Sequence, residues 1–391
     1  MPRVSVIVPV HNAGPYLRDA LESLSRQSFD DLEIVAVDDG STDASRQILW
    51  EHRRREPRLR VLEQPHRGTA QARDAAIAAA QGELLAFHDA DDLAMPERIA
   101  RQVAFLDAHP DLDVVGGALW SISADGHPLR EFRPPRGPET VRAHLEFRFH
   151  PAIAYVTVMV RRTTWERIGG HRAQFSVGQD QDALIRLLPA RMDNVPEVVT
   201  LYRRHTRQAT QRKQALVVYT AVMAKASHHC RRQGRPDPVD VWDGSLDIDL
   251  LAEYGTDPYL LAYLYAGLLT SGATTSTGEE EAPDTGAITA SPAQLRDRLA
   301  QIPLGRAELA GPVAMLLRAI PSYFRAQQWA TGVLFGARVV RHFPGECLRA
   351  LQALLQQRAL RSIRRGHGQL EALGAGTVGT DGRRHPGRML E

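Results

Sequence analysis

The aspartates at 89–92 are the residues whose types and spacing most directly indicate chemistry in this sequence. Asp89, Asp91 and Asp92 follow the apolar run 83–87. Carboxylates one residue apart at the end of a strand can reach the same divalent cation, and Mg²⁺ or Mn²⁺ prefers oxygen ligands shared with substrate phosphates. The spacing therefore indicates a metal site for a diphosphate substrate. A solvated acidic turn before a helix is the alternative.

Alternating strand and helix patterns surround these aspartates. The near-continuous apolar run 4–8 is typical of a parallel strand covered on both faces. Leu17, Leu21 and Leu24 recur at helical spacing within 16–27. The other expected strands are 33–37, 59–62, 83–87, 114–116 and 155–160, and the other expected helices are 69–80, one beginning near Pro96 and one after Asp180. This alternation predicts an α/β fold with a doubly wound sheet.

A second acidic pair, Asp38 and Asp39, ends the second expected strand. In doubly wound sheets, ligands bind outside the carboxyl ends of the strands, where the strand order switches. Both acidic clusters would therefore face one crevice. Asp38 could instead help to cap a helix that begins at Ser41, Thr42 or Asp43.

Four sequence blocks occur in a fixed order, and together they resemble the family 2 glycosyltransferases of the GT-A fold. The blocks are VSVIVPVHN at 4–12, VDDGSTD at 37–43, RGTAQARD at 67–74 and FHDADD at 87–92. The resemblance continues through TVMVR at 157–161, IGG at 168–170, GQDQD at 178–182 and YRRH at 202–205. It predicts a GT-A domain over residues 1–213. It implies an inverting, metal-dependent transfer of a sugar from a nucleoside-diphosphate sugar, with a UDP-sugar as the favoured donor, to a hydroxyl of a glycan or lipid-linked acceptor.

The resemblance implies a nucleotide pocket built from five residues. Pro9, Asn12, Asp39, Arg67 and Gly68 would line it, and the Asp39 carboxylate would accept a hydrogen bond from a base N–H. Ordinary turn geometry is the alternative for Pro9 and Gly68.

The resemblance also implies a metal site. Asp89 and Asp91 match the Asp-x-Asp motif of the family, in which Asp91 would be the direct ligand of Mn²⁺ or Mg²⁺ and Asp89 would contact the ribose of the donor. The metal would neutralise charge on the departing nucleoside diphosphate. His205 corresponds to a histidine that completes the metal or diphosphate site in many GT-A enzymes, and an ordinary surface histidine is the alternative.

Asp180 is the candidate general base that takes the proton from the acceptor hydroxyl. The family has a Glu-Asp pair here, whereas this chain has Gln179, which can form hydrogen bonds but carries no charge. Asp182 is the competing candidate, because either aspartate could simply be a first-turn helix residue. Asp74 stands where the family commonly has Asn, and we interpret it as structural.

The composition limits the other function classes. The 391 residues include 48 basic and 46 acidic ones, a net charge of +2, so no nucleic-acid partner is expected. Cys230 and Cys347 are the only two cysteines, which argues against a disulfide framework and a cysteine zinc site and favours the cytoplasm. The sequence has neither a signal-peptide pattern at its start nor an apolar run of roughly 18 to 20 residues.

The chain after residue 213 is expected to be mainly α-helical. We predict a helical extension over 214–270, a flexible linker or loop over 271–292, a helical C-terminal region over 293–365 and a disordered tail over 366–391. Arginines and apolar residues within 329–365 fit basic amphipathic helices, which could contact the inner face of a membrane peripherally. Packing of a domain or dimer is the alternative, and the sequence does not determine the oligomeric state.

The sequence argues against three other enzyme classes and leaves one non-enzyme alternative. A nucleotidyltransferase would carry a glycine-rich basic loop after the first strand, and a dinucleotide dehydrogenase would carry G-x-G-x-x-G there, but the sequence at 9–14 is PVHNAG. A processive polysaccharide synthase is not expected either, because such enzymes usually add transmembrane helices and a Gln-x-x-Arg-Trp motif, and this sequence shows neither. The main alternative is a catalytically degenerate scaffold that binds a nucleotide sugar and recruits partners through its C-terminal helices, an interpretation that Gln179 keeps open.

Overall fold

The structure, a computed structural model, describes residues 1–147, 152–206, 208, 213–254 and 256, together with positions 260, 261, 264 and 268. The chain divides into two compact units, Met1–Pro303 and Leu304–Glu391, and every described residue belongs to the first. The predicted linker 271–292, helical region 293–365 and tail 366–391 therefore lie outside the described residues.

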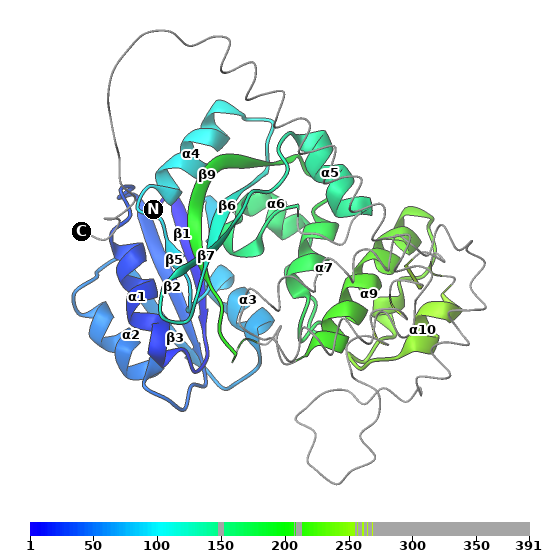
Figure 1. The fold of residues 1–391 in the computed structure, drawn as a ribbon, viewed down its shortest axis with the longest axis horizontal. Coiled ribbons are helices and arrows are strands. Elements are labelled where there is room, and N and C mark those ends of the chain that lie inside the picture. Colours follow the sequence, from blue (N-terminus) through cyan, green and yellow to red (C-terminus); the bar gives the residue numbers. More distant parts are fainter. Residues whose placement is uncertain are drawn as a thin grey trace, which may run out of the picture. The chain divides into compact units, whose positions relative to one another are not determined.

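Among the described residues, nine strands form one mixed sheet at the centre of the first unit (Figure 1). The strands are β1 (Val4–Val10), β2 (Leu32–Asp39), β3 (Leu59–Gln64), β4 (Leu84–Phe87), β5 (Leu93–Ala94), β6 (Val114–Ile122), β7 (Pro128–Phe132), β8 (Met159–Arg161) and β9 (Met192–Arg203). Their order is β3-β2-β1-β4-β8-β6-β9-β5, and β7 pairs with β6. The first four strands run parallel, whereas β8 is antiparallel to both of its neighbours. The predicted α/β class is confirmed.

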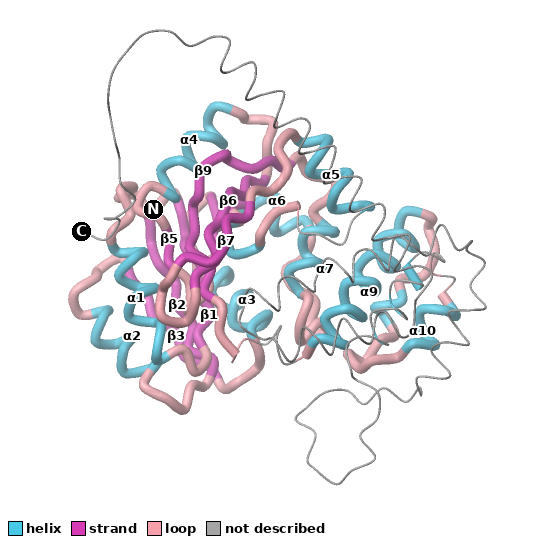
Figure 2. Tube along the Cα trace, in the orientation of Figure 1, coloured by secondary structure: helices cyan, strands magenta, loops and turns pink. Residues whose placement is uncertain are grey.

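Helices cover the sheet and extend beyond it. They are α1 (Gly14–Ser25), α2 (Ser45–Arg53), α3 (Thr69–Ala79), α4 (Arg98–Ala108), α5 (Pro138–Phe147), α6 (Arg162–Arg167), α7 (Gln179–Arg186), α9 (Gln214–Arg232) and α10 (Ile248–Glu253), with the 3-10 turns η1 (Tyr155–Thr157) and η2 (Pro238–Asp240). Figure 2 shows the strands gathered together, with α1 and α2 to one side of them and α3 to the other. No helix within the described part of the chain has the length and apolarity that crossing a bilayer requires.

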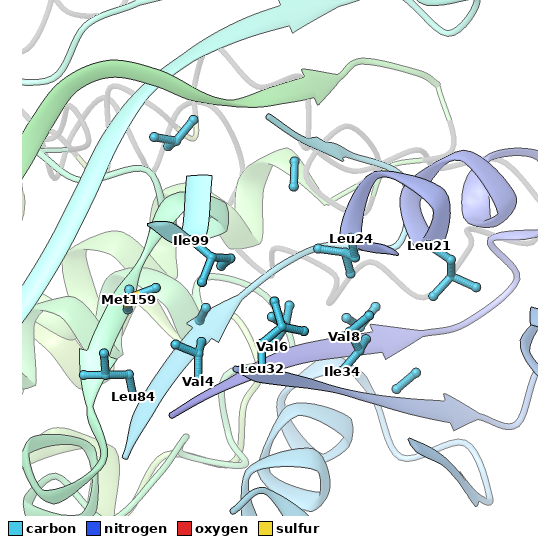
Figure 3. Close-up of a cluster of buried hydrophobic side chains, with 14 of the residues drawn as sticks. Val4, Val6, Val8, Leu21, Leu24, Leu32, Ile34, Leu84, Ile99 and Met159 are labelled. Atoms are coloured by element: carbon cyan, nitrogen blue, oxygen red, sulfur yellow. The ribbon is translucent and has the colours of Figure 1, made fainter. Parts of the chain in front are cut away.

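The hydrophobic core explains why the first helix and strand form as predicted. Val4, Val6 and Val8 alternate along β1 and belong to the same core cluster as Leu21 and Leu24 of α1, all of them fully buried (Figure 3). The apolar positions of α1 fall on one face because their spacing of three and four matches the helical turn. Each such leucine contributes about 1.5–3 kcal/mol when buried. This packing fixes β1, whose carboxyl end carries Pro9 and Asn12.

The strands β5, β7 and β9 and the helices α5 and α6 are not among the expected elements, and two expected elements begin later than predicted. The helix expected to begin at 41–43 begins at Ser45, because the Asp43 carboxylate accepts hydrogen bonds from the backbone N–H groups of Gly14 and Ser45, both at 2.9 Å. The strand expected at 155–160 is shorter, because Tyr155–Thr157 forms a 3-10 turn and only the following residues join the sheet as β8. Both segments satisfy their backbone groups locally before the regular element begins.

The described part of the helical extension belongs to the same unit as the sheet. Helices α7 and α9 lie side by side (Figures 1 and 2). Gly178, which precedes α7, has a φ of +72°, and a Cβ added there would clash with the side chain of Thr220 on α9, whose Cβ lies 2.9 Å away. The close approach of α9 therefore requires glycine at the start of α7.

Candidate functional site

The parallel strands bring distant sequence blocks to one edge of the sheet. In the register of the sheet, Val10 of β1 lies beside Asp38 of β2, and Asp39 lies beside Gln64 of β3. Strand β4 pairs with the other side of β1 and ends at Phe87. Because all four strands run in the same direction, the segments that follow them emerge at the same edge, as ligand-binding loops do in doubly wound sheets.

Asp39 is buried, and donors of this chain surround its carboxylate. Oδ1 accepts hydrogen bonds from Gln64 Nε2 at 2.7 Å and from the backbone N–H of Arg67 at 2.8 Å, and Oδ2 accepts one from the N–H of Gly68 at 2.8 Å. Burial opposes ionisation, but these hydrogen bonds outweigh it and lower the pKa of Asp39. The carboxylate thus holds the loop between β3 and α3, where Gly68 takes a φ of +94°.

The other predicted pocket residues lie around the same edge. Asn12 is exposed and has a left-handed φ of 50°, while its N–H donates to Ser41 Oγ at 3.0 Å and its Oδ1 accepts from the Thr42 N–H at 2.9 Å. Arg67 is also exposed, whereas Pro9 is buried within β1. The structure therefore brings the turns after β1, β2 and β3 together, with Asn12 and Arg67 open to a ligand.

The aspartates after β4 form a compact carboxylate group. One carboxylate oxygen from each of Asp89, Asp91 and Asp92 lies within 4.8 Å of the others. Asp92 is fully buried, and its Oδ1 accepts a hydrogen bond from the Arg203 N–H at 2.7 Å, whereas Oδ2 has no partner. Burial raises the pKa of Asp92, and the charges of Asp91 and Asp89 raise it further.

His205 joins this carboxylate group although 114 residues separate it from Asp91. Its Nε2 lies 2.8 Å from Asp91 Oδ2, and its ring packs against Tyr16 with a centroid distance of 4.8 Å. Strand β9, which ends just before His205, pairs antiparallel with β5, which begins just after the aspartates. That pairing makes His205 part of the site.

The residues present fit a divalent cation. Three carboxylates and one imidazole converge, and the unpartnered Oδ2 of buried Asp92 is an acceptor that a cation would satisfy. A mainly oxygen donor set suits Mg²⁺ or Mn²⁺. Asp91 would hold such an ion together with His205. Asp89 is shared with Arg73, whose Nη2 donates to Asp89 Oδ1 at 2.5 Å.

Asp180 lies in the first turn of α7 and is partly buried. Burial raises the pKa of its carboxyl above the usual range, and Asp89 raises it further, while the N–H of Gln181 and the charge of Arg73 lower it. The electrostatic coupling to Asp89 and Arg73 connects the start of α7 with the carboxylate group after β4. A carboxylate with a raised pKa is better matched to accepting a proton.

Asp182, the competing candidate, is occupied elsewhere. It is fully buried, Arg172 binds both of its oxygens, and Arg186 Nε donates to its Oδ2 at 2.9 Å. Arg172 also donates hydrogen bonds to Asp237 Oδ2 at 3.0 Å and to Ser227 Oγ of α9 at 3.1 Å. Asp182 thus anchors α7 to the helical extension.

The sequence interpretation missed a buried network beside Asp180. Arg73 is nearly fully buried, its guanidinium lies over the Tyr155 ring at 5.0 Å, and its Nε and Nη1 have no partner. The Tyr155 hydroxyl lies 2.6 Å from His171 Nε2, and His171 Nδ1 lies 2.6 Å from Asp74 Oδ1. One residue of the sequence could have indicated this network. Asp74 stands where the family commonly has Asn, and a carboxylate in that position needs a partner such as His171.

Comparison with known proteins identifies the family of this domain. Residues 5–169 match the model of glycosyl transferase family 2. The chain is 35% identical over 139 residues to the uncharacterized glycosyltransferase EpsJ of Bacillus subtilis, which covers 35% of this chain and 38% of that protein. It is 30% identical over 288 residues to the O-antigen biosynthesis protein RfbC of Myxococcus xanthus. That match covers 68% of this chain and 22% of RfbC. The matches span between 22% and 52% of the lengths of these two proteins and six further curated relatives.

Solved structures share the fold. The structure of residues 1–349 of TarS from S. aureus in complex with UDP-GlcNAc matches with a TM-score of 0.53 at 19% identity, over 90% of this chain and 92% of that chain. A second structure of the same TarS segment matches with a TM-score of 0.51. The chain belongs to the family 2 glycosyltransferases, through an N-terminal domain of the GT-A fold.

Proposed function

We propose that this protein is an inverting, metal-dependent glycosyltransferase that moves a sugar from a UDP-linked donor to a hydroxyl of a glycan or lipid-linked acceptor. The observation that carries the proposal is that the Asp39 loop and the aspartates after β4 follow neighbouring parallel strands at one sheet edge. The charges of Asp89 and Arg73 also act on Asp180 at the start of α7. These are the three parts that such a transfer needs: a nucleotide pocket, a charge-stabilising site for a diphosphate, and a base.

Each proposed residue has one task. Pro9, Asn12, Asp39, Arg67 and Gly68 form the nucleotide pocket, with Asp39 holding the pocket loop in place. Asp89 contacts the ribose of the donor. Asp91 and His205 hold Mn²⁺ or Mg²⁺, which when bound would stabilise the negative charge of the leaving diphosphate.

Asp180 accepts the proton of the acceptor hydroxyl while that oxygen attacks the anomeric carbon. A new carbon–oxygen bond forms as the bond from the same carbon to the diphosphate oxygen breaks, and attack from the opposite face inverts the configuration. Burial keeps the pKa of Asp180 raised, while the charge of Arg73 lowers it. Arg73 donates to Asp89 and has two nitrogens without a partner. Its guanidinium charge favours negative charge that develops near it.

The choice of donor and acceptor rests on relatives. The TarS structures that share this fold were determined with UDP and with UDP-GlcNAc, which supports a UDP-sugar. RfbC is described as an O-antigen biosynthesis protein and TuaG of Bacillus subtilis as a putative teichuronic acid biosynthesis glycosyltransferase, which supports a saccharide acceptor.

The first test is binding. Thermal unfolding of the full chain is measured with UDP, GDP and dTDP, each with and without Mn²⁺, for the wild type and for Asp91→Ala. A ligand at about 100 times its Kd stabilises the native state by roughly 2.7 kcal/mol. We expect the shift with UDP to require Mn²⁺ and to disappear in Asp91→Ala. A wild type that no nucleotide stabilises would contradict the proposal.

The second test separates an enzyme from a binding scaffold. UDP release from UDP-sugars is measured for the wild type and for Asp180→Asn, with a panel of saccharide acceptors. We expect Asp180→Asn to keep UDP binding and to lose at least about 100-fold in release rate, since general bases contribute about 10²–10⁴-fold. Equal rates in both proteins would remove Asp180 as the base, and binding without release in the wild type would favour the degenerate scaffold.

A further inference from the structure

Two histidines, His11 and His66, lie next to Asp39 at the edge of the sheet where β1, β2 and β3 end. His11 follows β1, and His66 lies in the loop between β3 and α3. Their rings stack with a centroid distance of 4.0 Å and an interplanar angle of 23°. Both rings are exposed at their outer sides, whereas Asp39 beneath them is buried.

The inner nitrogens of both rings point at the same residue. His11 Nδ1 lies 2.8 Å from the Asp39 backbone oxygen, and His66 Nδ1 lies 3.1 Å from that oxygen and 2.8 Å from Asp39 Oδ2. One ligand atom from each of the three residues lies within 4.8 Å of the others. Two ring nitrogens and two oxygens of Asp39 therefore lie close together.

These separations resemble those between neighbouring ligands of a metal ion. Ligand atoms about 2.1 Å from an ion lie roughly 3 Å apart at the right angles of an octahedral site and roughly 3.4 Å apart at the tetrahedral angles of zinc. The three nitrogen–oxygen distances to Asp39 fall close to the shorter of these spacings. Imidazole nitrogen together with carboxylate and carbonyl oxygen is a donor set that suits Zn²⁺, Ni²⁺ and related ions, whereas Mg²⁺ prefers oxygen alone.

We propose that His11, Asp39 and His66 form a binding site for a divalent transition-metal ion such as Zn²⁺ or Ni²⁺, separate from the carboxylates of Asp89 and Asp91. The ion takes the place of the protons that the two Nδ1 atoms direct at Asp39, and it joins the ends of β1 and β2 to the loop before α3.

The surroundings of Asp39 hold the site in shape before any ion binds. Hydrogen bonds from Gln64, Arg67 and Gly68 fix the orientation of the carboxylate. Such outer-shell contacts increase the affinity of a site for metal by orienting its ligands. Oδ2 accepts from Gly68 and also lies 2.8 Å from His66 Nδ1, because a carboxylate oxygen can accept more than one bond.

One consequence rests on the proposed function. Because Asp39 also belongs to the proposed nucleotide pocket, an ion held by the two histidines would occupy the space beside the base. Zinc would then weaken UDP binding without touching the metal site at Asp91. Metal binding itself is tested without any nucleotide, so failure of the proposed glycosyl transfer would leave the metal-site test intact.

The experiment measures Zn²⁺ and Ni²⁺ binding to the full chain by calorimetric titration. The variants are His11→Gln and His66→Gln. The matched control is His127→Gln, because His127 is an exposed histidine 3.2 Å from an aspartate, Asp125, in a loop. A second control, Asp91→Asn, removes a ligand of the carboxylate group and leaves the histidine pair unchanged.

We expect one tight Zn²⁺ site that survives in His127→Gln and Asp91→Asn and weakens by roughly 100-fold in either His11→Gln or His66→Gln, since the loss of an outer-shell partner alone costs about 10–100-fold. Thermal unfolding without metal checks that each variant is folded. Unchanged zinc affinity in both histidine variants, or a site that depends only on Asp91, would overturn the proposal.

Discussion

Asp180 and Asp182 lie two residues apart on α7, yet their surroundings give the two carboxylates different properties. Asp182 is enclosed by Arg172 and Arg186, which bind both of its oxygens. Asp180 has no such pairing, and burial raises the pKa of its carboxyl. The difference favours Asp180 as the proton acceptor.

The raised pKa of Asp180 predicts how activity depends on pH. Because a base must be ionised, kcat/KM should fall as the pH drops through a pKa that lies above the usual aspartate value. Gln179→Glu adds a negative charge next to Asp180 and should raise that pKa further, moving the acid limb of the pH–rate profile to higher pH. Steady-state rates of both proteins across pH check this. An acid limb that stays in place or moves to lower pH would remove Asp180 as the titrating group.

The buried Tyr155–His171–Asp74 network predicts an effect on stability. With His171 Nδ1 donating to Asp74, Nε2 accepts the hydrogen bond of the Tyr155 hydroxyl. His171→Phe would leave that buried hydroxyl unpaired and should lower the free energy of unfolding by about 1–3 kcal/mol. Chemical denaturation measures this free energy. Adding Tyr155→Phe to the same chain should recover part of the loss, and two independent, additive losses would mean that the hydrogen bond contributes nothing.

At the scale of elements, α7 is held between the sheet domain and the helical extension. Gly178 allows α9 to approach the start of the helix, and Arg172 connects Asp182 with Ser227 and Asp237. Lys225 of α9 also donates to the backbone oxygens of Leu145 and Glu146 at the end of α5, at 2.6 and 3.0 Å. The position of the candidate base therefore depends on residues after 213.

Opposite effects of two similar substitutions test this anchoring. Asp182→Asn breaks a buried ion pair and leaves arginine charge uncompensated, which typically costs about 3–5 kcal/mol. Asp180→Asn removes a carboxyl whose ionisation burial opposes, so at neutral pH it should leave the stability unchanged or higher. Urea denaturation of both variants against the wild type distinguishes these outcomes. A larger loss in Asp180→Asn would contradict the division of tasks between the two residues.

At the scale of the whole molecule, the first compact unit extends to Pro303 and includes α9. Tyr219, Val222 and Met223 of α9 are fully buried. The predicted boundary after 213 lies inside this unit. The predicted membrane contact and disordered tail concern residues outside the described part and stay predictions.

Truncation tests whether the extension is part of the folding unit. A fragment of residues 1–303 should unfold cooperatively with a Tm close to that of the full chain. A fragment of residues 1–213 loses the buried face of α9 and should melt at least roughly 10 °C lower, because each kcal/mol shifts Tm by about 2–4 °C in a domain of this size. Calorimetry on the two fragments measures both values. Equal melting temperatures would mean that 1–213 folds independently.

The sequence by itself determined the α/β class, the acidic residues that follow strands, and most of the strands and helices of the first 116 residues. It did not predict β5, β7 or β9. These features depend on local sequence. The helical spacing of Leu17, Leu21 and Leu24 predicts their helix, and the apolar run before Asp89 predicts a strand and the place where it ends. The resemblance to glycosyltransferase family 2 was also visible, because its motifs are short and keep their order.

The tertiary structure alone decided which side chains meet. The pairing of β5 with β9 brings His205 to Asp91 across 114 residues, and the 3-10 turn before β8 helps bring Tyr155 to His171 beside Asp74. The stacking of His11 on His66 above Asp39 likewise depends on three neighbouring strand ends. The physical reason is that a residue type limits what an atom can bind, whereas its partner depends on strand order and register, which many distant residues set together.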